Sequence, residues 1–198
     1  MNGDSGKSAG GSKSATAKYI AQAAMVAAAY AALAVALAPI SFREQQFRVS
    51  EALTVLPALM PSAVPGLFVG CVISNLMSPM GLPDLVFGSL ATLAAAALTR
   101  RIALSSAGSG AGASADAVTG AAPGSALGAA PILRALLAAS PPVAVNTLVV
   151  GAMLALFAGV PFGAAALGVF AGQAVSCYGL GVPLYLVVSR LVPRRLLV

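Results

Sequence analysis

Long apolar runs, separated by short polar or proline-rich connections, dominate the amino-terminal half of the chain. The first run spans residues 19–38, and others lie at 52–60, 64–77 and 84–101. None of them alternates apolar and polar residues, as the strands of a membrane barrel would. Because a bilayer core of about 30 Å is crossed by roughly 20 helical residues, these runs predict membrane helices.

The carboxy-terminal half continues the pattern after an interruption. In the stretch 105–130, 21 of 26 residues are Ala, Gly or Ser, so we expect a flexible linker. A short helix at 132–139 is predicted to lie in the membrane interface, before Pro141 and Pro142. A fifth membrane helix then follows at 143–160. A sixth follows at 163–191, and a break near its glycines at 179–181 stays an alternative.

These elements predict an all-α membrane protein with six transmembrane helices. Residues 1–18 form a polar Gly/Ser tail that we expect to be disordered and cytoplasmic. Residues 19–104 carry helices one to four, and residues 105–130 form the cytoplasmic linker. Residues 131–198 carry the interfacial segment and helices five and six.

Composition supports the membrane class and excludes several functions. Apolar residues make up 59% of the chain and charged residues 8%, against about 25% charged in soluble domains. The absence of His removes Ser-His and Cys-His catalysis and the commonest metal ligand. We therefore expect neither an enzyme nor a cofactor. Cys71 and Cys177 lie in separate apolar runs, which favours two small buried hydrophobes over a disulfide or a metal pair.

Lys and Arg residues are distributed unequally between the two predicted sides of the membrane. One side holds nine of them: Lys7, Lys13, Lys18, Arg100, Arg101, Arg134, Arg190, Arg194 and Arg195. The other side holds only Arg43 and Arg48. Because cytoplasmic loops carry the excess of positive charge, both termini are predicted to be cytoplasmic. This bias also accounts for the net charge of +6, so no nucleic-acid partner is expected.

Few strongly polar side chains remain at membrane depth, and they are the candidate ligand-binding residues. They are Gln45, Gln46, Arg48, Glu51, Asn75, Asp84, Asn146 and Gln173, with Tyr178 close to the last. A charge at the bilayer centre costs at least about 2.5–3.5 kcal/mol, which makes such residues functional candidates. Carboxylate, amide and guanidinium groups in the outer half of a bundle indicate a pocket for a polar, partly planar small molecule.

Structural roles are open alternatives for the same residues. Arg48 and Glu51, three residues apart, could neutralise each other, and Asp84 could serve as a helix-start residue. The amide side chains at 75, 146 and 173 could be interhelical hydrogen-bond partners. Small residues also suggest close helix packing, at Gly66 and Gly70 and along an alanine-rich face of the first helix.

Several segments resemble the queuosine-precursor transporter (QueT) family. They are residues 38–41 (APIS), 46–54 (QFRVSEALT), 65–71 (PGLFVGC) and 84–93 (DLVFGSLATL), followed by Asn146 and 177–181 (CYGLG). The similarity covers residues 19–104 and 141–192. It implies a six-helix substrate-specificity (S) component of an energy-coupling-factor (ECF) transporter, with an outward pocket for a 7-deazaguanine precursor of queuosine.

The resemblance also implies partners and residue roles. A membrane coupling protein would dock on an Ala-x-x-x-Ala face of helix one, matching Ala24 and Ala28 (or Ala23 and Ala27), and two separate subunits would hydrolyse ATP. Glu51 or Asp84 would accept hydrogen bonds from the N–H edge of the base, and Arg48 would orient the carboxylate. The amide side chains would contact the carbonyl and ring nitrogens of the base.

Two features depart from the family pattern. Gln173 stands where the family usually has Glu, and this glutamine would suit a neutral or differently substituted precursor. The linker at 105–130 is longer than the usual family connection. The main alternative function is a stand-alone secondary transporter or channel for a small polar solute. An intramembrane enzyme and a purely structural membrane subunit are further alternatives.

Overall fold

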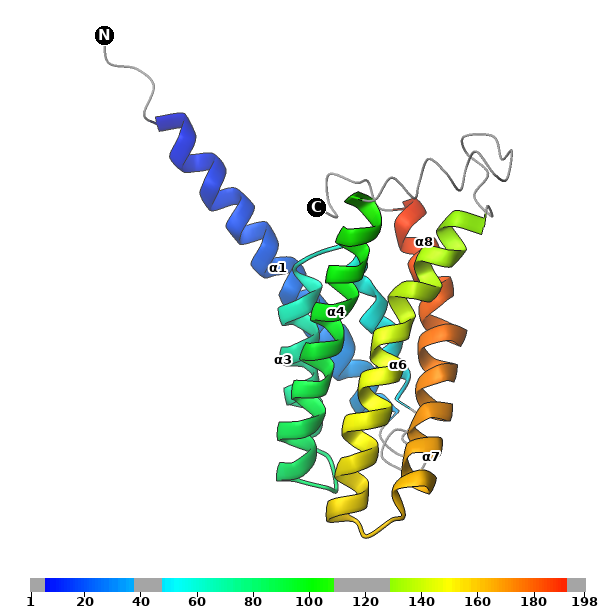
Figure 1. Cartoon of the computed structure of the whole chain (residues 1–198). Helices are drawn as coiled ribbons and strands as arrows, with labels where there is room; N and C mark the ends of the chain where they lie inside the picture. Colours follow the sequence, from blue (N-terminus) through cyan, green and yellow to red (C-terminus); the bar gives the residue numbers. More distant parts are fainter. Residues whose placement is uncertain (1–5, 38–47, 109–128, 192–198) are drawn as a thin grey trace.

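The computed structural model describes residues 6–37, 48–108 and 129–191, and these residues form a bundle of helices without strands (Figure 1). Four helical runs are long and apolar enough to cross a membrane, namely Lys13–Ala36, Asp84–Ser105, Pro131–Phe157 and Phe162–Leu191. Two shorter apolar helices, Val49–Ala58 and Ala63–Asn75, complete six helical segments in the described part of the chain. The all-α class is therefore confirmed, with four long spans and two short helices.

The elements follow one another with short connections inside the described ranges. They are α1 (Gly6–Ala36), the 3₁₀ helix η1 (Val49–Ala58), α3 (Ala63–Asn75), the π-helical η2 (Asp84–Gly88), α4 (Ser89–Gly108), α6 (Ala129–Phe157), α7 (Phe162–Ala174), the π-helical η3 (Val175–Gly181) and α8 (Val182–Leu191). The α3–α4 and α6–α7 turns lie at one end of the bundle, and α4 and α8 end at the other (Figure 1).

Close contact between α1 and α3 depends on two glycines. A Cβ atom at Gly66 would lie 2.6 Å from the backbone oxygen of Ala23, and one at Gly70 would lie 2.8 Å from that of Ala27. No larger residue fits there unless the helices separate. The structure thus confirms the packing role predicted for this glycine pair.

The first helix differs from its predicted bounds. It begins at Gly6 rather than at residue 19, so most of the predicted disordered tail is helical in the structure. Lys and Ala are good helix formers, and adding residues to an existing helix avoids the cost of nucleation. In Figure 1 the start of α1 projects beyond the bundle.

The predicted interfacial helix at 132–139 is also corrected. It forms the first part of α6, which continues through Pro141 and Pro142, and three of its alanines are buried. The two prolines cannot donate to the carbonyls of Leu137 and Ala138. The hydroxyl of Ser140 donates to the first of these at 2.9 Å. That of Thr99, on α4, donates to the second at 3.2 Å. Hydroxyls thus replace the lost backbone donors, and the helix is not interrupted.

The predicted break in the last helix takes another form. Residues 162–191 stay helical throughout, and the glycine-containing stretch is the π-helical η3. A wider helical turn keeps every residue in the helix, whereas a break would expose backbone polar groups to lipid.

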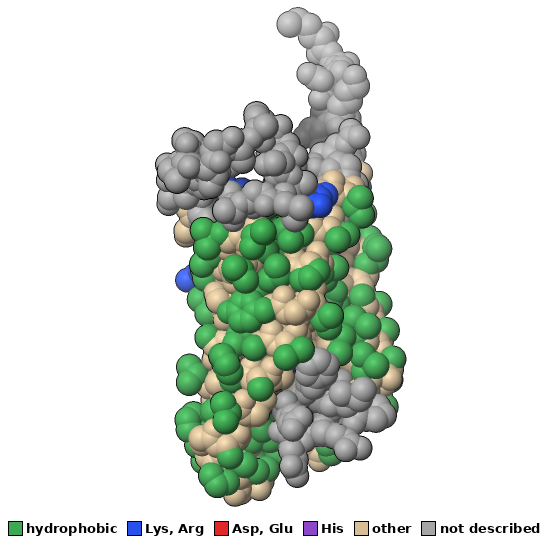
Figure 2. Space-filling model, turned by 90° about the vertical axis from the view of Figure 1, so that its right-hand side faces the viewer, with side chains coloured by type: hydrophobic (Ala, Val, Ile, Leu, Met, Phe, Trp, Pro, Cys, Tyr) green, Lys and Arg blue, Asp and Glu red, His purple; other side chains and the backbone are tan. Residues whose placement is uncertain are grey.

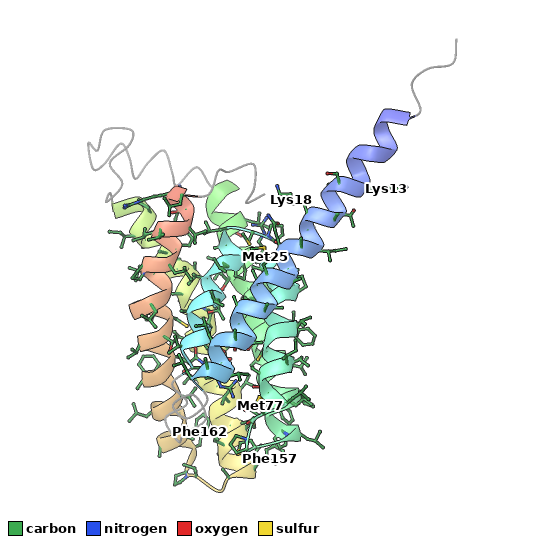
Figure 3. The ribbon with its side chains drawn as sticks, turned by 180° about the vertical axis from the view of Figure 1, so that it is seen from behind. Lys13, Lys18, Met25, Met77, Phe157 and Phe162 are labelled. Carbon is green, nitrogen blue, oxygen red and sulfur yellow. The ribbon has the colours of Figure 1, made fainter. Side chains whose placement is uncertain are left out.

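The outer surface of the bundle suits a lipid environment. Exposed large hydrophobic side chains occur on all the long helices, from Met25 on α1 to Leu191 on α8. Figure 2 shows hydrophobic side chains over one face, with Lys and Arg only toward the upper end. In Figure 3, Lys13 and Lys18 lie toward this end, while Met77, Phe157 and Phe162 lie at the opposite one. The molecule therefore has an apolar belt with one basic end.

Candidate ligand-binding site

A small polar cavity lies inside the bundle, between η1, α4, α6 and α7. It is lined by Arg48, Glu51, Gly88, Thr92, Asn146, Val150 and Gln173. Four of the residues predicted to bind a ligand therefore line one space, although they are up to 125 positions apart (173 − 48). The side chains leave no room for a whole water molecule there, so a ligand enters only if the lining moves.

Arg48 and Asp84 form the salt bridge at one side of this cavity. The guanidinium Nη2 lies 2.6 Å from Asp84 Oδ2, and both side chains are buried. The same oxygen accepts a hydrogen bond of 2.6 Å from Ser78. Asn75 joins the pair because its Oδ1 accepts from Arg48 at 3.2 Å and its Nδ2 donates to the Asp84 backbone oxygen at 2.9 Å. This network attaches the start of η1 to the turn between α3 and α4.

Glu51 has different partners from Asp84. Its Oε1 accepts a hydrogen bond of 2.6 Å from Tyr30 Oη on α1, and its Oε2 accepts one of 3.3 Å from Asn146 Nδ2 on α6. The carboxylate is 1% exposed, and it forms no salt bridge with any described residue. Of the alternatives left open by the sequence, a direct Arg48–Glu51 ion pair is not formed, because the arginine pairs with Asp84 and its charge reaches Glu51 only through space.

Two buried acceptor atoms beside the cavity lack a donor within the described residues. They are Asn146 Oδ1 and Asp84 Oδ1. The second lies against the cavity wall, since a Cβ atom built on Gly88 would come within 2.8 Å of it. A buried acceptor without a donor costs about 1–3 kcal/mol. Together with Glu51, these atoms form a surface suited to a ligand rich in N–H groups.

Unusual helical geometry places these groups. Arg48 is the extended residue that precedes the 3₁₀ helix η1, and Glu51 lies in its first turn, so the start of η1 presents both side chains to the cavity. The π-helical η2 carries Asp84 and Gly88, and η3 begins just after Gln173. Single π-helical turns often occur at functional sites, and here two of them adjoin one cavity.

Other predicted residues take supporting places. The side chain of Gln173 lines the cavity, and its Oε1 accepts from Cys177 at 3.5 Å. Tyr178 packs against a hydrophobic cluster and is not among the lining residues. Gln45 and Gln46 lie outside the described residues. Cys71 and Cys177 are both buried free thiols, as the sequence favoured.

Sequence reasoning missed Tyr30, Ser78, Gly88 and Thr92. Ser78, Gly88 and Thr92 are small residues of common types, and nothing in the local sequence separates them from packing positions. Tyr30 carried a usable signal, since it is the one polar aromatic residue between Gln22 and Leu37 in an alanine-rich helix. A buried tyrosine hydroxyl usually has a hydrogen-bond partner, and here that partner is Glu51.

Comparison with known proteins gives one family. A family model described as QueT transporter matches residues 20–190, which is most of the chain. Searches of curated proteins and of solved structures gave no match. The matched range contains every described residue of the cavity and all four long helical spans apart from the start of the first and Leu191 at the end of the last. The chain therefore belongs to the QueT transporter family and is a membrane transporter.

Proposed function

We propose that this chain is the S component of an ECF importer and that it binds a 7-deazaguanine precursor of queuosine. The observation that carries the proposal is the buried Glu51 carboxylate, which forms no salt bridge with a described residue and lines a cavity flanked by unpaired acceptors. A deazaguanine has a planar ring system whose edge carries several N–H donors, which matches this set of acceptors. Family membership supports a transport role.

The residues divide into binding and positioning groups under this proposal. Glu51 accepts from the N–H edge of the base, and the amides of Asn146 and Gln173 contact its carbonyl and ring nitrogens. Asp84 accepts through Oδ1 while Arg48 and Ser78 hold Oδ2 in place. Gln173 is neutral, so it suits a neutral or differently substituted precursor. No covalent step takes place in this chain.

The outer face of α1 is the proposed docking site for the membrane coupling protein. Ala24 and Ala28 are both exposed on this face. The alternative pair, Ala23 and Ala27, contacts α3 through Gly66 and Gly70 instead. A face of small side chains allows close approach by another helix. Two separate ATPase subunits would supply the energy for import.

Calorimetry with a panel of 7-deazaguanines tests the ligand assignment on the purified, folded protein. We expect saturable binding of at least one member, and guanine and adenine serve as controls. Absence of binding by the whole panel would contradict the proposal.

Uptake into cells that lack the coupling protein and its ATPases distinguishes an ECF importer from the main alternative function. Transport in those cells would favour a stand-alone transporter or channel.

Gly88→Ala tests whether the ligand occupies the observed cavity. The new methyl group would lie 2.8 Å from Asp84 Oδ1 and 3.0 Å from Asn75 Nδ2. We expect affinity to fall at least tenfold, or about 1.4 kcal/mol, in calorimetry on monodisperse protein. Gly163→Ala is the matched control, because nothing lies within 4 Å of a Cβ atom there. Equal affinities for the two variants would place the ligand elsewhere.

Ala28→Leu tests the docking face. A branched side chain on this exposed position blocks close helix approach, so we expect loss of co-purification with the coupling protein and of uptake, with ligand binding nearly unchanged. Ala164→Leu, on an exposed position of α7, is the control. Intact assembly together with lost ligand binding would show that the face serves internal packing.

A further inference from the structure

Tyr30 connects the first helix to the cavity. It lies on α1, is fully buried, and its hydroxyl donates to Glu51 Oε1 at 2.6 Å. The side chain begins where α1 crosses α3, and a Cβ atom on Gly70 would lie 2.9 Å from Tyr30 Cβ. The small glycine therefore leaves room for the tyrosine to reach into the bundle.

The Glu51 carboxylate is held from two directions. Tyr30 on α1 occupies one oxygen and Asn146 on α6 occupies the other. A carboxylate has about four acceptor positions, so both oxygens can still accept from a ligand. Both donors are neutral, so neither of them forms an ion pair with the carboxylate. A group fixed in this way loses little conformational freedom when a ligand binds.

The same helix carries two features with opposite orientations. Ala24 and Ala28 are exposed on its outer face, whereas Tyr30 is buried and reaches Glu51. Any ligand that contacts Glu51 therefore lies one hydrogen bond away from α1.

We propose that Tyr30 is a positioning residue, whose hydroxyl fixes the Glu51 carboxylate for the ligand and links occupancy of the cavity to α1. This inference rests on the proposed function, because its ligand is the 7-deazaguanine assigned above. It adds a residue that the sequence did not indicate as part of the site, and it assigns the buried face of α1 a role in binding.

A double-mutant cycle tests this role by calorimetry with the best-binding 7-deazaguanine. The variants are Tyr30→Phe, Glu51→Gln and the combination, and Tyr185→Phe is the control. Tyr185 is also buried, but it belongs to a hydrophobic cluster and is not itself a lining residue. We expect Tyr30→Phe to weaken binding about tenfold, and Tyr185→Phe to leave it unchanged. In the Glu51→Gln background the effect of Tyr30→Phe should nearly vanish, because the hydroxyl acts through that carboxylate.

Amide hydrogen exchange gives a second measurement, on α1 itself. The ligand should increase protection of α1 in the parent protein and in Tyr185→Phe, and this increase should be lost in Tyr30→Phe. Equal or tighter binding by Tyr30→Phe, or an equal loss in both Glu51 backgrounds, would overturn the inference alone. If the ligand left the amide hydrogen exchange of α1 unchanged in the parent protein, the proposed link between cavity occupancy and α1 would be contradicted. Failure of the parent to bind any deazaguanine would overturn the proposed function and this inference with it.

Discussion

At the residue scale, the two buried carboxylates differ in how their charge is balanced. Asp84 lies 2.6 Å from a guanidinium nitrogen of Arg48, whereas Glu51 accepts only from a hydroxyl and an amide through its side chain. The ion pair neutralises one charge inside the bundle and attaches η1 to the α3–α4 turn. The charge on Glu51 is left for the proposed ligand. Two acids that look equivalent in the sequence therefore have separate roles.

Substitutions at this ion pair should be strongly non-additive. Arg48→Gln or Asp84→Asn alone leaves a buried charge without its partner, which costs about 3–5 kcal/mol. The double variant leaves no unpaired charge, so we expect it to be destabilised by clearly less than the sum of the two. Unfolding in detergent, followed by circular dichroism, measures all three. Additive losses would mean that the two groups contribute independently to stability.

At the element scale, the irregular helices place the site. The start of η1 joins the extended Arg48 to Glu51 in the first 3₁₀ turn, and both side chains line the cavity. The π-helical η2 lies just before α4 and η3 lies between α7 and α8, and both adjoin the cavity. The close α1–α3 contact belongs to the same arrangement, since it brings Tyr30 to Glu51.

Gly70→Ala tests how much the bundle depends on that contact. The methyl group would lie 2.8 Å from the Ala27 backbone oxygen, and overpacking of this kind costs about 1–3 kcal/mol. We expect a lower unfolding temperature than for the parent protein. Gly163→Ala should leave the temperature unchanged or slightly raised, because a Cβ atom there has open space and Ala is the better helix former. Equal shifts for both variants would contradict the proposed tight crossing.

At the scale of the whole molecule, the apolar belt and the basic end suggest one orientation in the membrane. The described Lys and Arg residues other than Arg48 lie on the parts of α1, α4, α6 and α8 nearest this end. Arg48 is buried in its ion pair and so does not count as a loop charge. Leaving Arg48 out of the count of Lys and Arg increases the predicted difference in positive charge between the two sides of the membrane. We keep the prediction that the basic end faces the cytoplasm.

Cysteine labelling tests the orientation at two exposed positions. Phe162→Cys, at the α6–α7 turn, should react with a membrane-impermeant maleimide on intact cells. Lys13→Cys, at the basic end, should react only after the membrane is opened. The parent protein is a suitable background, because Cys71 and Cys177 are each 0% exposed. Reaction of both positions from the same side would contradict the prediction that the two ends of the bundle face opposite sides of the membrane. The opposite labelling pattern would mean that the basic end faces outward.

The sequence by itself determined the membrane class, the approximate helices and the polar residues within them. Lipid makes this possible, because each spanning segment must satisfy its own backbone hydrogen bonds and present apolar side chains. Those requirements act locally along the chain. The sequence also placed Arg48, Glu51, Asn146 and Gln173 among the candidates that now line one cavity.

Only the tertiary structure decided how those residues pair. The partners of Arg48 and Glu51 lie on other helices, 36 and 21 positions away. Which side chains meet at those separations depends on helix rotation and depth, and these are set by close packing such as that at Gly70. Likewise, α6 continues through Pro142 because Thr99, on a different helix, replaces a lost donor. Hydropathy is a property of each segment, whereas these hydrogen bonds exist only once the segments are packed together.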